Sequence, residues 1–278
     1  MTPDLHPLRL SISDIRARKN SAAPLVCLTA YSAPMAQLLD PHCDILLVGD
    51  SMGMALYGMD NTLTVTLDML IAHGRAVMRK RRKACVLVDM PYDTYEQSSA
   101  LAYQNALRLM TETGCDGVKL EGGREMQETI AHLSSKGIPV MAHIGLKPQS
   151  VLKEGGYKIK GKTPDEADAL IEDARAVEAA GAFAILIEGT VEPVARAITL
   201  AVSIPTIGIG ASPACDGQIL VTEDLLGLTV DHTPKFVKTY ANLGKIITDA
   251  VSSYAEDVRV RAFPDESHVY KADAKTKT

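Results

Sequence analysis

Several features that mark whole classes of protein are missing from this chain of 278 residues. No stretch is apolar for long enough to span a bilayer, so we expect no membrane partner. Residues 1–5 lack a basic region followed by an apolar core, which argues against a secretory signal peptide. These absences predict a cytoplasmic protein.

Cysteine is scarce, and no Cys-x-x-Cys pair occurs among the five cysteines. Four of them lie within or beside apolar segments, so we expect buried, reduced thiols and a reducing compartment. The five are Cys27, Cys43, Cys85, Cys115 and Cys215.

Basic residues form only one block, Arg-Lys-Arg-Arg-Lys at residues 79–83, in a chain whose formal net charge is −5. The block follows an expected helix. A solvated helix end that complements the helix dipole accounts for it better than a nucleic-acid site does. We therefore expect no nucleic-acid partner, and the 46% apolar and 23% charged residues are typical of a globular protein.

Runs rich in Val, Ile and Leu alternate with helix-like segments from about residue 24 to about residue 230. The expected strands are residues 25–29, 44–48, 85–88, 117–120, 138–142, 183–187, 206–209 and 226–230. This count predicts an α/β fold, a TIM (β/α)8 barrel. A doubly wound open sheet is the rival, because alternation alone cannot separate the two. No Gly-x-Gly-x-x-Gly fingerprint follows the first strand, which disfavours a dinucleotide-binding version of the rival.

Helix boundary signals support this count. Thr163 is expected to cap a helix and to form a capping box with Glu166. Gly114, Gly137 and Gly181 are expected to end helices in the left-handed conformation, each followed closely by a strand.

The chain shows no domain boundary and no repeat, so a single domain over residues 1–278 is expected. Residues 13–19 are expected to form a short leading helix that plugs the bottom of the barrel. Residues 271–278 are polar and are expected to form a disordered tail.

Acidic side chains stand where four of the apolar runs end: Asp50, Asp89, Glu121 and Glu188. The C-terminal ends of barrel strands open onto one face, so these carboxylates should converge there. Each alone has a structural explanation, but chance would scatter acids over both strand ends. Crowded carboxylates are costly unless a cation or a proton neutralises them. Asp50, Asp89 and Glu121 suit a magnesium-type ion, and a set of His or Cys ligands for zinc is not seen.

Two nitrogen-bearing side chains lie in the same runs. Lys119 precedes Glu121 by two residues and so shares its strand face. Burying a lysine is costly unless it pairs with acids or an anionic substrate, and a snorkelling surface lysine is the alternative. His143 ends another strand, where a substrate contact and a hydrogen-bonded core histidine are both possible.

The motifs resemble a known family. They are Leu-Thr-Ala-Tyr at 28–31, Val-Gly-Asp-Ser-Met-Gly at 48–53, Val-Asp-Met-Pro at 88–91, Val-Lys-Leu-Glu-Gly-Gly at 118–123, Pro-Val-Met-Ala-His-Ile-Gly at 139–145, Gly-Gly-Tyr-Lys at 155–158, Glu-Gly at 188–189, Pro-Thr-Ile-Gly-Ile-Gly at 205–210 and Cys-Asp-Gly-Gln at 215–218. In this order and spacing, over about residues 9–266, the set resembles ketopantoate hydroxymethyltransferase.

The resemblance implies a barrel of the phosphoenolpyruvate-mutase-like type that assembles as a homo-oligomer, a decamer of two pentameric rings. It implies transfer of a hydroxymethyl group from 5,10-methylenetetrahydrofolate to 3-methyl-2-oxobutanoate. The product would be 2-dehydropantoate for pantothenate and coenzyme A biosynthesis, formed through a magnesium-stabilised enolate.

The resemblance also implies roles for particular residues. Asp50 and Asp89 would hold Mg²⁺, with Glu121 in the same metal site through water. Glu188 would be the catalytic proton acceptor. The substrate-binding residues would be Asp50, Ser51, Asp89, Lys119 and His143.

Four positions depart from the family pattern: Thr64, Lys147, Ser212 and Ala214. None is a proposed metal ligand, but Ser212 and Ala214 leave details of a folate-side loop open. Residues 153–162, with three glycines, are expected to form a lid that dries the site.

Two other functions compete with this one. A related lyase on the same barrel would carry a cysteine in its lid, and residues 153–162 contain none. A barrel kept only as a binding subunit is the second alternative, and the intact set of acids disfavours it.

Overall fold

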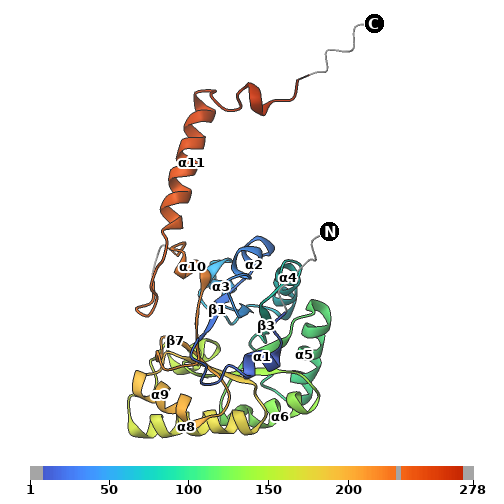
Figure 1. Ribbon diagram of the computed structural model, residues 1–278, viewed down its shortest axis with the longest axis vertical. Coiled ribbons are helices and arrows are strands. Elements are labelled where there is room, and N and C mark those ends of the chain that lie inside the picture. Colours follow the sequence, from blue (N-terminus) through green and yellow to red (C-terminus); the bar gives the residue numbers. More distant parts are fainter. Residues whose placement is uncertain (1–8, 230–232, 272–278) are drawn as a thin grey trace. The chain divides into compact units, whose positions relative to one another are not determined.

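The computed structural model describes residues 9–229 and 233–271, and there eight parallel strands close into a barrel in chain order (Figure 1). Each strand pairs with the next in sequence, and β8 closes on β1. The strands are β1 (Leu25–Thr29), β2 (Ile45–Val48), β3 (Cys85–Asp89), β4 (Gly117–Glu121), β5 (Val140–Gly145), β6 (Ala184–Glu188), β7 (Thr206–Ile209) and β8 (Gly217–Leu220). The predicted TIM barrel is confirmed, and the open doubly wound sheet is excluded.

Two units are distinguished by their internal contacts: Met1–Thr222 with Lys235–Val237, and Glu223–Pro234 with Lys238–Thr278. The first unit contains the barrel. The single domain expected over residues 1–278 stays a prediction. The tail expected at 271–278 lies outside the described residues, apart from Lys271.

The longer helices of the barrel unit cover the outside of the strands, as Figure 1 shows for α4, α5, α6, α8 and α9. The helices in the described part of this unit are α1 (Ile12–Arg16), α2 (Ala33–Leu39), α3 (Met52–Ala55), α4 (Leu67–Met78), α5 (Ser99–Thr113), α6 (Gln127–Ser135), α7 (Val151–Glu154), α8 (Pro164–Ala179) and α9 (Glu192–Ala201), with 3-10 turns η1 (Arg124–Met126) and η2 (Pro148–Ser150). The expected positive φ is found at Gly114, Gly137 and Gly181.

The N-terminus of α8 agrees only in part with its prediction. Thr163 caps the helix, and its hydroxyl accepts a hydrogen bond from the backbone N–H of Glu166. The carboxylate of Glu166, however, accepts from the backbone N–H of Lys162 and not from that of Thr163. The reciprocal bond of a capping box is therefore replaced by a bond one residue earlier.

Alternate residues of each strand face opposite sides, and each side has its own apolar cluster. Leu87, Met141 and Leu186 belong to a cluster inside the barrel. Their strand neighbours Val86 and Ala142 belong to the larger cluster beneath the helices. The interior is therefore a packed core and not a channel.

Helix α1 lies at Ile12–Arg16, where a leading helix was expected at 13–19, and packs against the N-terminal end of the barrel. Ser11 and Asp14 form a capping box at its start. Ile15 is 1% exposed and joins the inner cluster, which also holds Leu25 and Ile45 at the beginnings of their strands.

The prediction of the eighth strand at 226–230 is wrong. Strand β8 lies earlier, at Gly217–Leu220, and Leu226 lies in a turn, while Val230 is outside the described residues. The N–H of Gly227 donates to the carbonyl of Asp224, and that of Leu228 to Glu223, a pattern that ends α10 (Thr222–Leu225). The apolar residues after Leu225 therefore follow the end of a helix and do not form a strand. The sequence of β8 contains a glycine and a glutamine among its four residues, so it lacks the apolar run by which the other strands were predicted.

The basic block at 79–83 follows α4 as expected, but it is not wholly solvated. Arg81 is 8% exposed, and its guanidinium pairs with Asp116 at 3.0 Å. Arg81 also donates to the carbonyl of Ala84. This residue of the block is therefore structural.

The second unit is built around α11 (Leu243–Arg259), a helix of 17 residues that Asn242 caps. None of its residues is buried. Its exposed apolar side chains are Ile246, Ile247, Val251, Tyr254 and Val258. Across residues 9–229 and 233–271, no helix has the length and apolar character that crossing a membrane requires.

Ile15→Ala should destabilise the barrel, because it leaves a cavity in the inner cluster. We expect a loss of roughly 2–5 kcal/mol in the free energy of unfolding, measured by denaturant titration. Ser13→Ala, at an exposed position of the same helix, is the control and should change it little. Equal stability of the two variants would contradict the role of Ile15 as a plug.

Candidate functional site

The inner face of the barrel changes from apolar to ionisable at the C-terminal strand ends. Asp89 lies opposite Lys119 in the register of β3 and β4, and Glu121 lies opposite His143 in that of β4 and β5. Glu188 lies opposite Gly145 at the end of β6. Each of these ionisable groups stands on the inner face of its strand, so the structure brings the predicted residues together.

Gly145 permits the close approach of β5 and β6 at this point. Its φ is +90°, and a Cβ there would lie 2.3 Å from the carbonyl oxygen of Glu188. Only glycine combines this backbone conformation with this contact.

Asp50 and Asp89 are buried side by side, at 4% and 2% exposure. The backbone N–H of Asp50 donates to Oδ2 of Asp89 over 3.0 Å, which joins the turn after β2 to the end of β3. Burial raises the pKa of Asp89, and the charge of Lys119 opposes that rise. Burial likewise raises the pKa of Glu121. A nearby positive charge therefore stabilises the ionised form of both carboxyls.

Lys119 supplies that charge. It is 4% exposed, so the surface alternative is excluded, and its Nζ lies 3.2 Å from Oδ1 of Asp89. Burial alone would lower the pKa of Lys119, but the carboxylates of Asp89 and Glu121 outweigh it and raise the pKa. Lys119 is therefore a permanent cation at the centre of the site.

His143 is neutral, and its tautomer follows from its neighbours. Nζ of Lys119 lies 3.3 Å from Nδ1 of His143. An ammonium group can only donate, so Nδ1 accepts and the ring hydrogen is on Nε2. Burial, with the nearby charge of Lys119, lowers the pKa of His143 well below its ordinary value. Nε2 lies 3.3 Å from Oε2 of Glu188, so the ring turns its N–H toward that carboxylate.

Glu188 differs from the other acids in its access to solvent, because its side chain is 18% exposed. Burial raises the pKa of Glu188 to about 7, against the opposing charge of Lys119. A carboxyl with this pKa exchanges a proton near neutral pH, which suits a general acid–base group.

Sequence reasoning missed three hydrogen-bonding residues of the site. The hydroxyl of Tyr31 lies 2.7 Å from that of Ser51. Tyr95 accepts a hydrogen bond from the backbone N–H of Glu121, and its own hydroxyl donates to Gln149. Tyr31 and Gln149 lie in or beside quoted motifs, but nothing in their spacing showed that they would reach the site.

The carboxylate oxygens of the site fit a cation that takes few ligands from the protein. Among the described residues, no three His, Cys, Asp or Glu side chains are grouped so that they could enclose a metal. Oε1 of Glu121 is nevertheless buried without a hydrogen bond within the same described part, and Oδ1 of Asp89, also buried, is paired with the ammonium group of Lys119 at 3.2 Å. Mg²⁺ keeps several waters and binds through one or two carboxylates. The set therefore fits Mg²⁺ better than a closed zinc site.

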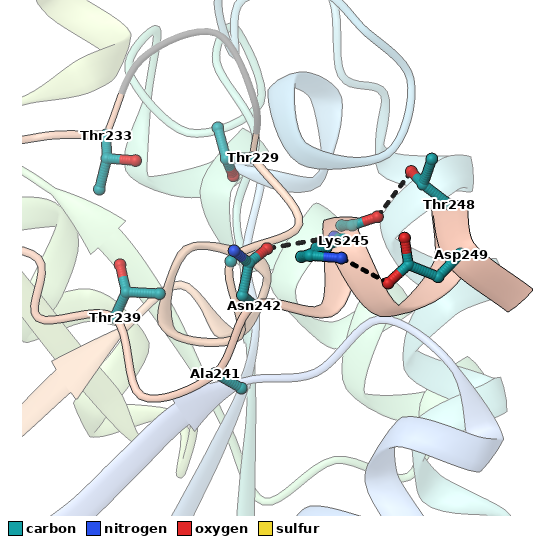
Figure 2. A pocket seen from close by; sticks show the side chains of 10 residues that line it. Thr229, Thr233, Thr239, Ala241, Asn242, Lys245, Thr248 and Asp249 are labelled. Atoms are coloured by element: carbon teal, nitrogen blue, oxygen red, sulfur yellow. Dashed lines mark hydrogen bonds and ion pairs between the residues drawn. The ribbon is translucent and has the colours of Figure 1, made fainter.

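A pocket of about 520 Å³ in the second unit has a different character (Figure 2). Its polar groups are largely paired: Lys245 donates to Asp249 over 2.6 Å, and Asn242 accepts from the backbone of Lys245. None of its lining residues is buried as the acids inside the barrel are. The chemistry is therefore concentrated at the barrel end.

Comparison with known proteins assigns the family. Residues 9–266 match the sequence model of the family described as ketopantoate hydroxymethyltransferase. The chain belongs to this family. It is 60% identical over 263 residues to the 3-methyl-2-oxobutanoate hydroxymethyltransferase of Rhizobium etli, covering 95% of this chain and 96% of the relative. It is 58% identical over 270 residues to that of Paramagnetospirillum magneticum, covering 97% and 98%.

Solved structures of other enzymes share the fold of this chain. A phosphonopyruvate hydrolase in complex with oxalate and Mg²⁺ superposes with a TM-score of 0.59 at 13% identity, covering 93% of each chain. A 2,3-dimethylmalate lyase, a member of the PEP mutase/isocitrate lyase superfamily, gives 0.57 at 16% identity, covering 98% and 93%. At these identities the likeness shows the fold alone.

The four departures from the family pattern bond elsewhere. Lys147 pairs with Glu125 at 2.6 Å, and Ser212 donates to Glu192 over 2.8 Å. Ala214 donates its N–H to the hydroxyl of Ser212. The hydroxyl of Thr64 contacts the sulfur of Met59. None of these bonds involves one of the converging carboxylates.

The assignment of His143 can be checked by NMR of protein labelled with ¹⁵N-histidine. At about pH 6, where a free histidine is mostly protonated, His143 should still show a neutral ring with its hydrogen on Nε2. Burial and Lys119 both disfavour the charged form, so protonation should appear only at lower pH. Free ¹⁵N-histidine in the same buffer is the control, and its ring should be mostly protonated at this pH. A protonated His143 at about pH 6 would contradict the assignment.

Proposed function

We propose that this chain transfers a hydroxymethyl group from 5,10-methylenetetrahydrofolate to 3-methyl-2-oxobutanoate and so makes 2-dehydropantoate for pantothenate biosynthesis. Its family and the names of its relatives support this reaction. The observation that carries the proposal is a buried lysine paired with one of several converging carboxylates, with a proton-exchanging acid nearby. An anionic keto acid whose C3 proton must be removed needs these groups. The family match also favours this transfer over the lyase and the inactive barrel.

Asp50 and Asp89 are the residues that would hold a divalent cation, and Glu121 would contact it through water. When bound, the ion would polarise the keto group of the substrate and acidify its C3 proton. The buried Oε1 of Glu121, which has no hydrogen bond within the described residues, supports this assignment.

Lys119 would bind the carboxylate of the keto acid, because it is a buried cation with donor capacity left over after its bond to Asp89. Ser51, with its hydroxyl fixed by Tyr31, would donate to the same substrate. His143 would contact the substrate from the neighbouring strand while its N–H faces Glu188.

Glu188 would accept the C3 proton, since its pKa of about 7 lets it be ionised before the transfer and protonated after it. The carbon that loses the proton would then attack the methylene group of the folate. Residues 153–162 would close over the site and exclude water. The backbone of Lys160 in that segment already bonds to Gly189, next to Glu188.

We also propose a homo-oligomer, and the family resemblance suggests two pentameric rings. Exposed apolar side chains support association with further copies of the chain. Val26 on the outer face of β1 is 49% exposed, and the large apolar side chains of α11 in the second unit are exposed along the helix. A cytoplasmic location is the accompanying proposal, supported by five free and buried cysteines.

The central test is an assay of purified protein with 3-methyl-2-oxobutanoate and methylenetetrahydrofolate. We expect 2-dehydropantoate to form with added Mg²⁺ and to be lost in excess chelator. Asp50→Ala and Asp89→Ala should each abolish the metal-dependent turnover, because each removes an oxygen ligand.

Asp60→Ala removes an exposed carboxylate and is the matched control, so it should keep wild-type turnover. Full activity in excess chelator would exclude the metal, and no product under any condition would exclude the reaction.

Glu188→Gln should retain Mg²⁺ and keto-acid binding but lose most of its turnover, because the amide cannot accept the proton. Wild-type turnover should fall as the pH drops below about 7, since protonation removes the base. Loss of deuterium from C3-labelled keto acid and product formation are measured together.

Two results would revise the role of Glu188. If both rates stay at the wild-type level, Glu188 is only structural. If deuterium loss continues while product formation fails, Glu188 acts on the folate and another group takes the C3 proton.

A further inference from the structure

Gln149 stands at the centre of the polar network below the carboxylates. It lies in η2, just after β5, and is 6% exposed. Its Nε2 donates to Oδ2 of Asp50 over 2.7 Å and to the carbonyl of Met90 over 3.0 Å. Its Oε1 accepts from the hydroxyl of Tyr95, and its backbone N–H donates to Oε2 of Glu121 over 3.0 Å. One residue thus binds groups that follow or end β2, β3 and β4.

Glutamine is suited to this position because both its amide donors and its acceptor are used. A glutamate could not donate to Asp50, and an apolar side chain would leave the carbonyl of Met90 and the hydroxyl of Tyr95 buried without these partners. Pro148 begins η2, so the backbone N–H of Gln149 lies in the first turn, where no helical carbonyl is available to it. That N–H is free to bond to Glu121.

Gln149 holds the carboxylates of Asp50 and Glu121 in an asymmetric way. Gln149 holds one oxygen of each carboxylate, Oδ2 of Asp50 and Oε2 of Glu121. Within the described residues, Oε1 of Glu121 is buried without a hydrogen bond, and Gln149 contacts Asp50 through Oδ2, which leaves Oδ1 available. Each carboxylate is therefore fixed by one oxygen and free at the other.

We propose that Gln149 is a positioning residue that aims the free oxygens of Asp50 and Glu121 at a divalent cation. The inference rests on the proposed function, because it requires that Asp50 and Glu121 belong to a metal site. Residues that hold metal-binding carboxylates in place commonly change metal affinity by about 10–100-fold when they are removed.

The test is Mg²⁺ binding to the purified full chain, measured by isothermal titration calorimetry without substrate. Gln149→Met keeps the size of the side chain and the backbone N–H that bonds to Glu121, but removes the side-chain bonds to Asp50, Met90 and Tyr95. The Kd for Mg²⁺ should therefore rise by about 10–100-fold. Turnover of this variant should recover when Mg²⁺ is raised to saturation. Gln218→Met, on β8, is the matched control. It removes the bond from Nε2 of Gln218 to the carbonyl of Ser212 and should leave the Kd for Mg²⁺ unchanged.

The outcomes separate the two proposals. If the wild-type chain binds no Mg²⁺, the metal site of the proposed function fails. If the wild type binds and Gln149→Met binds equally well, or turnover stays low at saturating Mg²⁺, the positioning role is overturned. Should Gln149→Met not fold, Gln149→Asn is measured with the same two outcomes, because its amide is one methylene shorter and cannot hold all the partners at once.

Discussion

The ion pair between Lys119 and Asp89, buried inside the barrel, is the interaction on which the rest of the site depends. Two like charges a few ångströms apart near a protein surface repel by about 4 kcal/mol, so ionised carboxylates at both Asp50 and Asp89 are costly unless a cation or a proton neutralises one of them. Breaking a buried pair by removing one partner typically costs about 3–5 kcal/mol, because the other charge is left uncompensated. Lys119 therefore allows the acids to gather, and their charges in turn keep Lys119 protonated.

The closed barrel places these charged residues next to one another through its strand faces and its register. A step of two residues along a strand keeps side chains on one face, so Asp89, His143 and Glu188 continue the inner rows begun by apolar residues. The parallel register then sets Lys119 opposite Asp89 and His143 opposite Glu121. Rigid, fully hydrogen-bonded strands hold these groups where loops would let the repelling acids separate.

Much of this arrangement could be predicted from the sequence, because buried parallel strands are apolar and carry their functional residues at their ends. Asp50, Asp89, Glu121 and Glu188 were expected on one face for that reason, and they converge there. Strand β8 could not be found in the same way. It has only four residues, and its central Gln218 faces outward, so the apolar run that ends at Val230 gave the stronger but false signal.

Gln149 was missed for a different reason. Its role depends on a turn that brings one amide within reach of three strand ends, and no periodicity in the chain encodes that contact. The tautomer of His143 is equally a property of its neighbours, since it follows from the ammonium group of Lys119. Strand-end chemistry is local in sequence, whereas the hydrogen bonds that orient it are not.

The charge balance of the site suggests why a divalent cation and a titrating acid would occur together. Four carboxylates face a single ammonium group, because His143 is neutral. An anionic keto acid would add to this excess negative charge, so binding it favours either a further cation or a proton on one of the acids. A cation held by Asp50, Asp89 and Glu121 would neutralise part of this negative charge. Glu188 is farther toward solvent, and its pKa of about 7 lets it take the proton instead. The same imbalance that makes a cation favourable thus keeps one acid ready for proton transfer.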